Sequence, residues 1–364
     1  MRYYALIWML LVSSQALAAD KLLFALDLIR HGDRTPIYSL PASKHEWPQG
    51  GGQLTTIGME QEYQLGIKFR KKYIDETHLL PKKYSPSVMY VRSTNTDRTL
   101  MSAQALLLGL YPQGTGNMPS GHTLIPIHTL SWEQDEIVPY HMLHGELSEK
   151  FFAKHAYTQK EWLAKKKQIS HKFATWSKMT GLDVADLHQV YQLGDTLFIH
   201  QQHQAPLPDG LSDKDVEGII LHGKWAFAAS FKPKAIGSTI GGGLLTTVTD
   251  YVRDAGNKKS PLKYVLLSGH DSSILTLLSA MHAPAVQAPP YASVLNVSLY
   301  EDHKQKRYVK VTLNDKPVSI PHCAKRTVCT LAEFSELIEN TKPHVDHEAL
   351  KAFQKESHKA KKLH

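Results

Sequence analysis

The sequence has 364 residues, of which 42% are hydrophobic and 21% charged. This composition excludes a disordered or collagen-like chain, and we expect one large domain or two coupled ones with a full hydrophobic core. The formal charge of +8 and the 21 histidines favour anionic substrates and a surface that becomes more positive as pH falls. The lysines lack interleaved aromatic residues, so we expect no nucleic-acid partner.

Residues 1–19 have the layout of a cleaved export signal. Arg2 precedes the apolar run ALIWMLLV, and the short motif ALA ends at Ala18. This run is too short to span a bilayer, and no later apolar stretch is long enough. We therefore expect an exported protein, periplasmic or secreted, without stable membrane insertion.

Three apolar runs predict buried strands. They are LLFALDLI at 22–29, SVMYV at 87–91 and KYVLLS at 263–268. Near-continuous apolar residues suit a sheet that is covered on both faces. Helical patterns over 55–73 and 96–110 fit crossovers covering this sheet. The first pattern places Met59, Tyr63, Ile67 and Tyr73 on one face.

From about Gly114 to Pro233 the pattern is mainly helical. Thr158 and Glu161 predict a capping box for a helix that ends at Gly181. Its apolar stripe, interpreted as core packing, consists of Trp162, Ile169, Phe173 and Trp176. The motif GGGLL, which starts at Gly241, lacks the lysine of a nucleotide-binding loop, so a helix start or close packing is favoured.

The remaining segments complete the predicted architecture. Residues 294–301 and 307–314 alternate like a two-stranded antiparallel ribbon at a sheet edge. The predicted fold class is α/β, with a central mixed, mostly parallel sheet flanked by helices and a largely helical insert (cap) domain. The predicted divisions are a signal at 1–19, a catalytic core at 20–113 and 234–340, the insert at 114–233 and a basic tail at 341–364.

Two cysteines, Cys323 and Cys329, are the whole cysteine content. In an oxidising compartment, two cysteines six positions apart favour a disulfide that closes a small loop. A zinc site would need further ligands that this segment does not supply. We therefore expect a disulfide and no metal.

Polar side chains follow each of the three predicted strands. Arg30 and His31 follow the first strand, Arg92 the second, and His270 and Asp271 the third. Ligands bind beyond the carboxyl ends of strands in open parallel sheets, so these groups are expected in one crevice.

These residue types suit phosphate chemistry. Guanidinium groups match phosphate oxygens in geometry and charge, so Arg30, Arg34 and Arg92 are predicted to cradle a tetrahedral dianion. A neutral imidazole can attack phosphorus, and His31 is the predicted nucleophile. His270 is predicted to bind a phosphate oxygen, and Asp271 to protonate the leaving alkoxide, which implies activity in acid.

Two neighbouring residues receive other interpretations. Arg98 is predicted to be structural and to pair with an acid on its own helix. Asp33 could orient an arginine or cap the following turn, and both readings stay open.

The heptapeptide RHGDRTP, at 30–36, resembles the signature of the histidine acid phosphatases, the Arg-His-Gly-x-Arg-x-Pro branch of the histidine phosphatase superfamily. Further blocks resemble those of lysosomal and prostatic-type acid phosphatases, in the same order and over nearly the whole mature chain. They include VRSTNTDRTLMSAQALLLGLYP, IPIHTL, SGHDSSILTLLSAM and PPYASVLNVSLYE. We expect a bacterial member of this family.

The resemblance implies hydrolysis of small phosphomonoesters through a phosphohistidine, without metal or cofactor. At matching positions it assigns His31 as nucleophile, Asp271 as proton donor, and phosphate binding to Arg30, Arg34, Arg92 and His270. A homodimer is expected by analogy with related enzymes. Two alternatives stay open, a catalytically silent phosphate-binding protein and a phosphotransferase that uses the same intermediate. Cysteine-rich phytases share the heptapeptide, so the two cysteines here argue against phytate as the principal substrate.

Overall fold

The computed structural model describes residues 20–43, 45–116, 118–132, 134–137 and 149–341. The predicted export signal, and nearly all of the predicted basic tail, lie outside the described residues. In the part of the chain described, no helix is long and apolar enough to cross a membrane.

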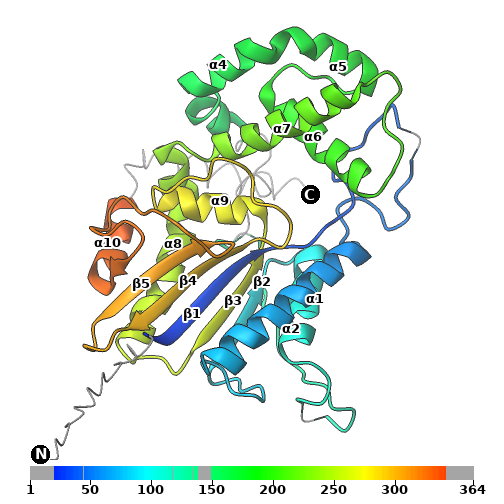
Figure 1. Cartoon of the computed structure of the whole chain (residues 1–364). Coiled ribbons are helices and arrows are strands. Elements are labelled where there is room, and N and C mark those ends of the chain that lie inside the picture. The colour runs from blue at the N-terminus through cyan, green and yellow to red at the C-terminus, as the bar shows by residue number, and fades with distance from the viewer. Residues whose placement is uncertain (1–19, 44, 117, 133, 138–148, 342–364) are drawn as a thin grey trace, which may run out of the picture.

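A single mixed sheet forms the centre of the molecule (Figure 1). Its strands are β1 (Lys21–Arg30), β2 (Met89–Ser93), β3 (Tyr264–Gly269), β4 (Val294–Glu301), β5 (Arg307–Leu313), β6 (Lys316–Pro317) and β7 (Cys329–Thr330). The order is β2-β3-β1-β4-β5-β6, and β7 pairs with β5. The three strands predicted from apolar runs are β1, β2 and β3, and they run parallel to one another.

The α/β class and the mixed sheet are confirmed, but the sheet is not mostly parallel. Among the described strands, β1–β4, β4–β5, β5–β6 and β5–β7 are all antiparallel. The predicted antiparallel pair is present as β4 and β5, yet β4 lies inside the sheet because it pairs with β1 along nearly its whole length. The first six residues of β4 are buried, as in an interior strand.

Helices cover both faces of the sheet (Figure 1). On one face lie α1 (Thr56–Arg70), its π-helical extension (Lys71–Glu76) and α2 (Asp97–Leu110), which share an apolar core with β1, β2 and β3. On the other face lie α8 (Lys234–Gly256), α9 (Asp271–Ala280) and α10 (Leu331–Thr341).

The predicted apolar face of the first helix is wrong in part, although its start is right. Tyr73, in the π-helical extension, is buried. Thr55 caps α1 by accepting a hydrogen bond from the amide of Gly58. Met59 and Ile67 are exposed, whereas Glu62 and Phe69 are buried. Glycines at 58 and 66 let neighbouring backbone approach closely, so a glycine-lined face packs inward in place of the apolar one.

Four helices form a separate layer above the sheet (Figure 1). They are α4 (Lys160–Ile169), α5 (Phe173–Thr180), α6 (Leu187–Gln202) and α7 (Asp213–Ser230), and they share their own apolar core. All four residues of the predicted stripe are buried in it, although a 3-10 turn at Ser170–Lys172 divides the helix. Gly181 ends α5 with φ 73°, as predicted. Gln159, not Thr158, occupies the N-cap of α4.

The GGG motif lies inside α8, so close packing and not a helix start explains it. A Cβ on Gly241 would lie 2.5 Å from the carbonyl oxygen of Thr276 in α9. The neighbouring Gly242 has no atom within 4 Å of an added Cβ. Gly241 therefore allows α8 and α9 to cross closely behind the site.

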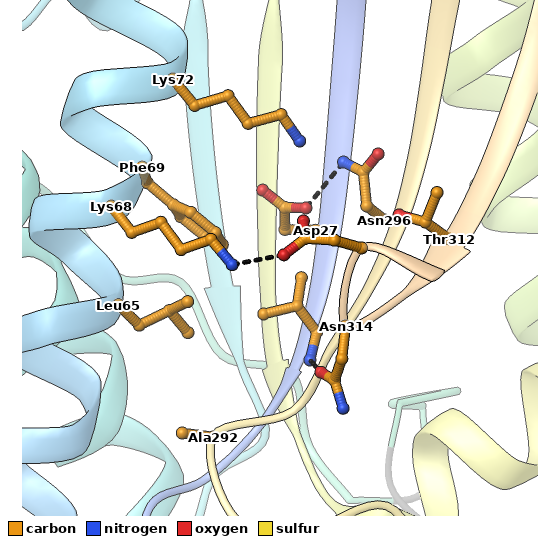
Figure 2. A pocket seen from close by; sticks show the side chains of 11 residues that line it. Asp27, Leu65, Lys68, Phe69, Lys72, Ala292, Asn296, Thr312 and Asn314 are labelled. Atoms are coloured by element: carbon orange, nitrogen blue, oxygen red, sulfur yellow. Dashed lines mark hydrogen bonds and ion pairs between the residues drawn. The ribbon is translucent and has the colours of Figure 1, made fainter. Parts of the chain in front are cut away.

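A buried polar cluster anchors β1 just before the site (Figure 2). The Asp27 carboxylate accepts hydrogen bonds from Asn296 (2.7 Å), Tyr73 (2.7 Å) and Tyr264 (3.0 Å). Burial raises the pKa of Asp27, and these hydrogen bonds and Lys72 oppose the rise. The cluster borders a small cavity of about 70 Å³ between α1 and the sheet. It ties β1 to three other elements and so fixes the strand that carries Arg30.

The predicted disulfide joins Cys323 and Cys329, whose Cα atoms are 5.0 Å apart. Both cysteines are buried in the core beneath α10. The disulfide closes the turn that leads into β7.

Candidate active site

His31 lies immediately beyond the end of β1, and its backbone amide donates to the carbonyl of Gly269 at 3.1 Å. Its side-chain Nδ1 is 2.7 Å from the carbonyl oxygen of Gly32. A carbonyl can only accept, so Nδ1 carries the proton and Nε2 keeps its lone pair. The ring is buried, with 2% of the residue exposed.

The surroundings of His31 keep its ring neutral. Burial lowers the pKa of His31 well below its ordinary value, and the nearby charges of Arg98, Arg30, His270 and Arg34 lower it further. A neutral imidazole with a free Nε2 is the form that can act as a nucleophile.

Arg30 and Arg34 bracket this ring. The Nη2 of Arg30 pairs with Asp271 at 2.8 Å, and its Nη1 donates to the carbonyl of Pro289 at 2.6 Å. The Nη2 of Arg34 contacts both carboxylate oxygens of Asp195, at 3.0 and 3.2 Å. Asp195 belongs to α6, so the helical layer contributes directly to the cluster. Sequence reasoning missed Asp195 because nothing local marks it.

The third arginine of the cluster is Arg98 and not Arg92. Arg98, in the first turn of α2, lies 3.4 Å from the Nδ1 of His270. Of the nearby charges, that of Arg98 lowers the pKa of His31 the most. Among the described residues Arg98 has no acidic partner on its own helix, which contradicts the predicted pairing. Burial, together with the nearby charge of Arg34, lowers the pKa of Arg98 to about 10.

Arg92 points away from the cluster. It pairs with Glu136 at 2.7 Å and with Asp135 at 3.6 Å. Its neighbour in the sheet is Leu267, which packs against α8. Side chains alternate along a strand, so Arg92 shares that face. The sequence prediction assigned Arg92 to the site because it follows an apolar run, without asking which face of the strand its side chain would occupy. That alternation is the signal that could have excluded Arg92.

His270 and Asp271 begin α9 at the end of β3. The His270 ring lies 5.5 Å from the His31 ring, and its Nε2 is 3.1 Å from the Thr94 hydroxyl. Asp271 accepts a hydrogen bond from the Ser272 amide and pairs with Arg30. A carboxyl group at this position lies beside the cluster of arginines.

Several donors in the cluster are buried and without partners. Among the described residues, the Nε atoms of Arg30, Arg34 and Arg98 and the hydroxyl of Tyr291 form no hydrogen bond. Tyr291 stacks on Arg30, with the guanidinium carbon 4.1 Å from the ring centroid. Buried donors are costly when unmet, and a tetrahedral oxyanion is the species that would satisfy them.

Asp33 connects the cluster to α6 and to α1. One of its oxygens lies 2.6 Å from the Nε2 of His203 and 2.6 Å from the Thr55 hydroxyl. Asp33 therefore contacts a histidine and a threonine, and no arginine of the described part of the chain pairs with it. This geometry favours the reading in which Asp33 holds the turn.

No group of three histidine, cysteine, aspartate or glutamate side chains is arranged to hold a metal ion in the described part of the chain.

The model for the histidine phosphatase superfamily (branch 2) matches residues 21–314, which include every group described above. The chain belongs to this superfamily.

Relatives within the superfamily extend along most of the chain. Lysosomal acid phosphatase of Xenopus laevis is 32% identical, over 92% of this chain and 80% of its own length. Human prostatic acid phosphatase is 28% identical, over 89% of this chain and 86% of its own length.

Solved structures of phytases share this histidine phosphatase fold. The phytase of Hafnia alvei in complex with tartrate has a TM-score of 0.69 at 19% identity, over 90% of this chain and 99% of its own. The phytase of Citrobacter braakii has a TM-score of 0.66 at 17% identity, over 89% of this chain and 98% of its own. At these identities the likeness concerns the fold alone.

Proposed function

We propose that this protein is an acid phosphatase that hydrolyses phosphomonoesters through a phosphohistidine on His31. The observation that carries the proposal is a buried, neutral imidazole whose Nε2 keeps its lone pair. It lies near three buried arginines whose Nε atoms form no hydrogen bond within the described residues. The named acid phosphatase relatives support the same activity.

In the first step, Nε2 of His31 attacks phosphorus while the bond to the leaving oxygen breaks. Arg30, Arg34 and Arg98 bind the equatorial oxygens and stabilise the charge that they carry in the transition state. The protonated Asp271 transfers its proton to the leaving alkoxide. Because a carboxyl group donates only when protonated, we expect the highest activity in acid.

In the second step, water attacks the phosphohistidine. Asp271, now a carboxylate, accepts the proton of the water, and inorganic phosphate departs from a regenerated His31. A phosphotransferase would differ only in using an alcohol in place of water. The disulfide and the relatives named as lysosomal support a location in an oxidising compartment outside the cytoplasm.

The experiment is hydrolysis of 4-nitrophenyl phosphate by the mature protein between acid and neutral pH, with excess chelator. We expect no turnover by His31→Ala and a loss of about 10²- to 10⁴-fold by Asp271→Asn. His171→Ala, at an exposed histidine in the helical layer, is the matched control and is expected to keep full activity.

A ³²P-labelled substrate followed by denaturation in alkali should label the wild-type chain, since phosphohistidine survives alkali. Full activity of His31→Ala would contradict the nucleophile. Phosphate binding without turnover by the wild type would favour a silent binding protein. Added glycerol yielding glycerol phosphate would favour phosphotransfer.

A further inference from the structure

A cavity of about 160 Å³ lies beside the phosphate cradle, between α6, α7 and the loop 287–291. Its wall includes Arg30, Asp271, Tyr191, Phe198, Tyr291 and Lys224. Arg30 and Asp271 form the end next to His31, where a leaving group separates from phosphorus. The cavity is therefore placed to hold the leaving group. A cavity of about 150 Å³ accommodates a benzene ring.

A chain of aromatic rings in tilted contact leads away from the nucleophile. The Tyr291 ring lies 5.8 Å from the His31 ring, and the Phe198 ring lies 6.2 Å from that of Tyr291. The Nζ of Lys224 lies 3.9 Å from the centroid of Phe198. A flat apolar group bound against these rings would thus extend from the phosphate toward an ammonium group.

Lys224 has no counter-ion among the described residues. The two carboxylates of the cavity already pair with arginines, Asp271 with Arg30 and Asp195 with Arg34. Within the described ranges, Lys224 forms no ion pair. Its side chain is partly buried, and burial lowers the pKa of Lys224, as does Arg30, while Asp195 opposes them. An anion from the ligand would supply the missing partner.

We propose that Lys224 is a specificity-determining residue that selects phosphomonoesters whose leaving group is an aromatic ring carrying a second anionic group on a short spacer. The inference rests on the proposed function, because the leaving group occupies this cavity when His31 attacks phosphorus. The ring packs against Phe198 and Tyr291, and the anion pairs with Lys224. A leaving group with a neutral end leaves the ammonium group unpaired.

The test compares two substrates that differ only in this charge. They are the phosphate monoesters of 3-(4-hydroxyphenyl)propionate and of its amide, in which two methylene groups insulate the phenol from the substituent. We measure the ratio of kcat/KM for the acid to that for the amide. Lys224→Met is expected to lower this ratio about tenfold, the effect of one charged hydrogen bond. Lys224→Arg is expected to retain it.

Lys214→Met is the matched control, because Lys214 is exposed in the first turn of the same helix, α7. It should leave the ratio at its wild-type value. An equal ratio in the wild type and in Lys224→Met would overturn the inference.

A binding experiment separates this inference from the proposed function. The phosphonomethyl analogues of the two esters cannot be hydrolysed, and calorimetry gives their affinities directly. A preference for the acid that falls in Lys224→Met supports the role of Lys224, even if neither ester is turned over. Turnover of both esters, with affinities that do not depend on Lys224, overturns the inference and leaves the phosphatase intact.

Discussion

Arg92 and Arg98 are two arginines six positions apart with opposite surroundings. Arg92 already has Glu136 and Asp135 as partners, whereas Arg98 contacts His270 and forms no ion pair among the described residues. Only the second can offer its charge to a ligand without first giving up an ion pair.

Arg98→Ala is expected to lower kcat/KM and to raise the inhibition constant of inorganic phosphate, each by about 10- to 100-fold, the value of a charged hydrogen bond. Arg92→Ala is expected to leave the phosphate inhibition constant near wild type. It should instead lower the free energy of unfolding by about 3 kcal/mol, because two carboxylates lose their buried partner. Steady-state kinetics and urea unfolding of both variants check this contrast, and a phosphate constant sensitive only to Arg92 would reverse the assignment.

Glu62 is a second residue with a measurable signature. Its side chain in α1 is 0% exposed, and among the described residues neither carboxylate oxygen has a partner. Burial raises the pKa of Glu62 well above its ordinary value of 4.5. The folded protein therefore holds this carboxyl group protonated where the unfolded chain would release the proton. The stability that Glu62 contributes is complete below pH 4.5 and is lost as pH rises toward the raised pKa.

Glu62→Gln should remove this loss of stability at higher pH, because glutamine does not titrate. The free energy of unfolding of the variant relative to wild type is expected to increase between pH 5 and pH 8, by at most about 1.4 kcal/mol per pH unit. Urea unfolding across this range measures it, with the exposed Glu60→Gln in the same helix as control. A difference that stays constant with pH would show that Glu62 titrates normally in the folded state.

At the scale of elements, strands were easier to predict than helix faces. Continuous apolar runs located β1, β2 and β3 to within two residues at their ends, since a strand buried on both faces needs such a run. The buried face of α1 was not predictable from hydrophobicity. Glycines at 58 and 66 have no side chain, so neighbouring backbone packs closely against the helix at these positions. Excluding Arg92 from the site likewise depends on which face of β2 its side chain occupies.

The crossing of α8 and α9 gives a prediction for two adjacent glycines. Gly241→Ala is expected to destabilise the protein by about 1–3 kcal/mol, because its Cβ would meet the Thr276 carbonyl. Gly242→Ala is expected to stabilise it by about 0.5–1 kcal/mol, because the position is open and alanine favours helix. Urea unfolding of the two variants measures both, and effects of the same sign would contradict the close crossing.

At the scale of the whole molecule, an ion pair between Asp195 of α6 and Arg34 joins the helical layer to the site at the end of the sheet. The side chains are 9% and 3% exposed, so each depends on the other for its charge partner. A bound phosphate would share Arg34 with Asp195. Ligand binding and the contact between the two layers are therefore linked.

Asp195→Asn is expected to lower the free energy of unfolding by about 3 kcal/mol in phosphate-free buffer, because Arg34 is left unpaired. Phosphate should then stabilise the variant more than the wild type, since the anion supplies the missing charge without a competing carboxylate. Thermal unfolding with increasing phosphate measures both effects. An identical phosphate dependence of Tm in the two proteins would show that Arg34 does not bind the ligand.

The position of β1 also determines when the molecule can fold. This strand precedes the other described strands along the chain, yet both of its neighbours, β3 and β4, come from residues 264–301. A nascent chain that ends before residue 264 holds β1 with both edges unpaired, and His31 without His270 or Asp271 beside it. Folding must therefore wait until most of the polypeptide has left the ribosome, so an unfinished chain has neither a closed sheet nor a working site.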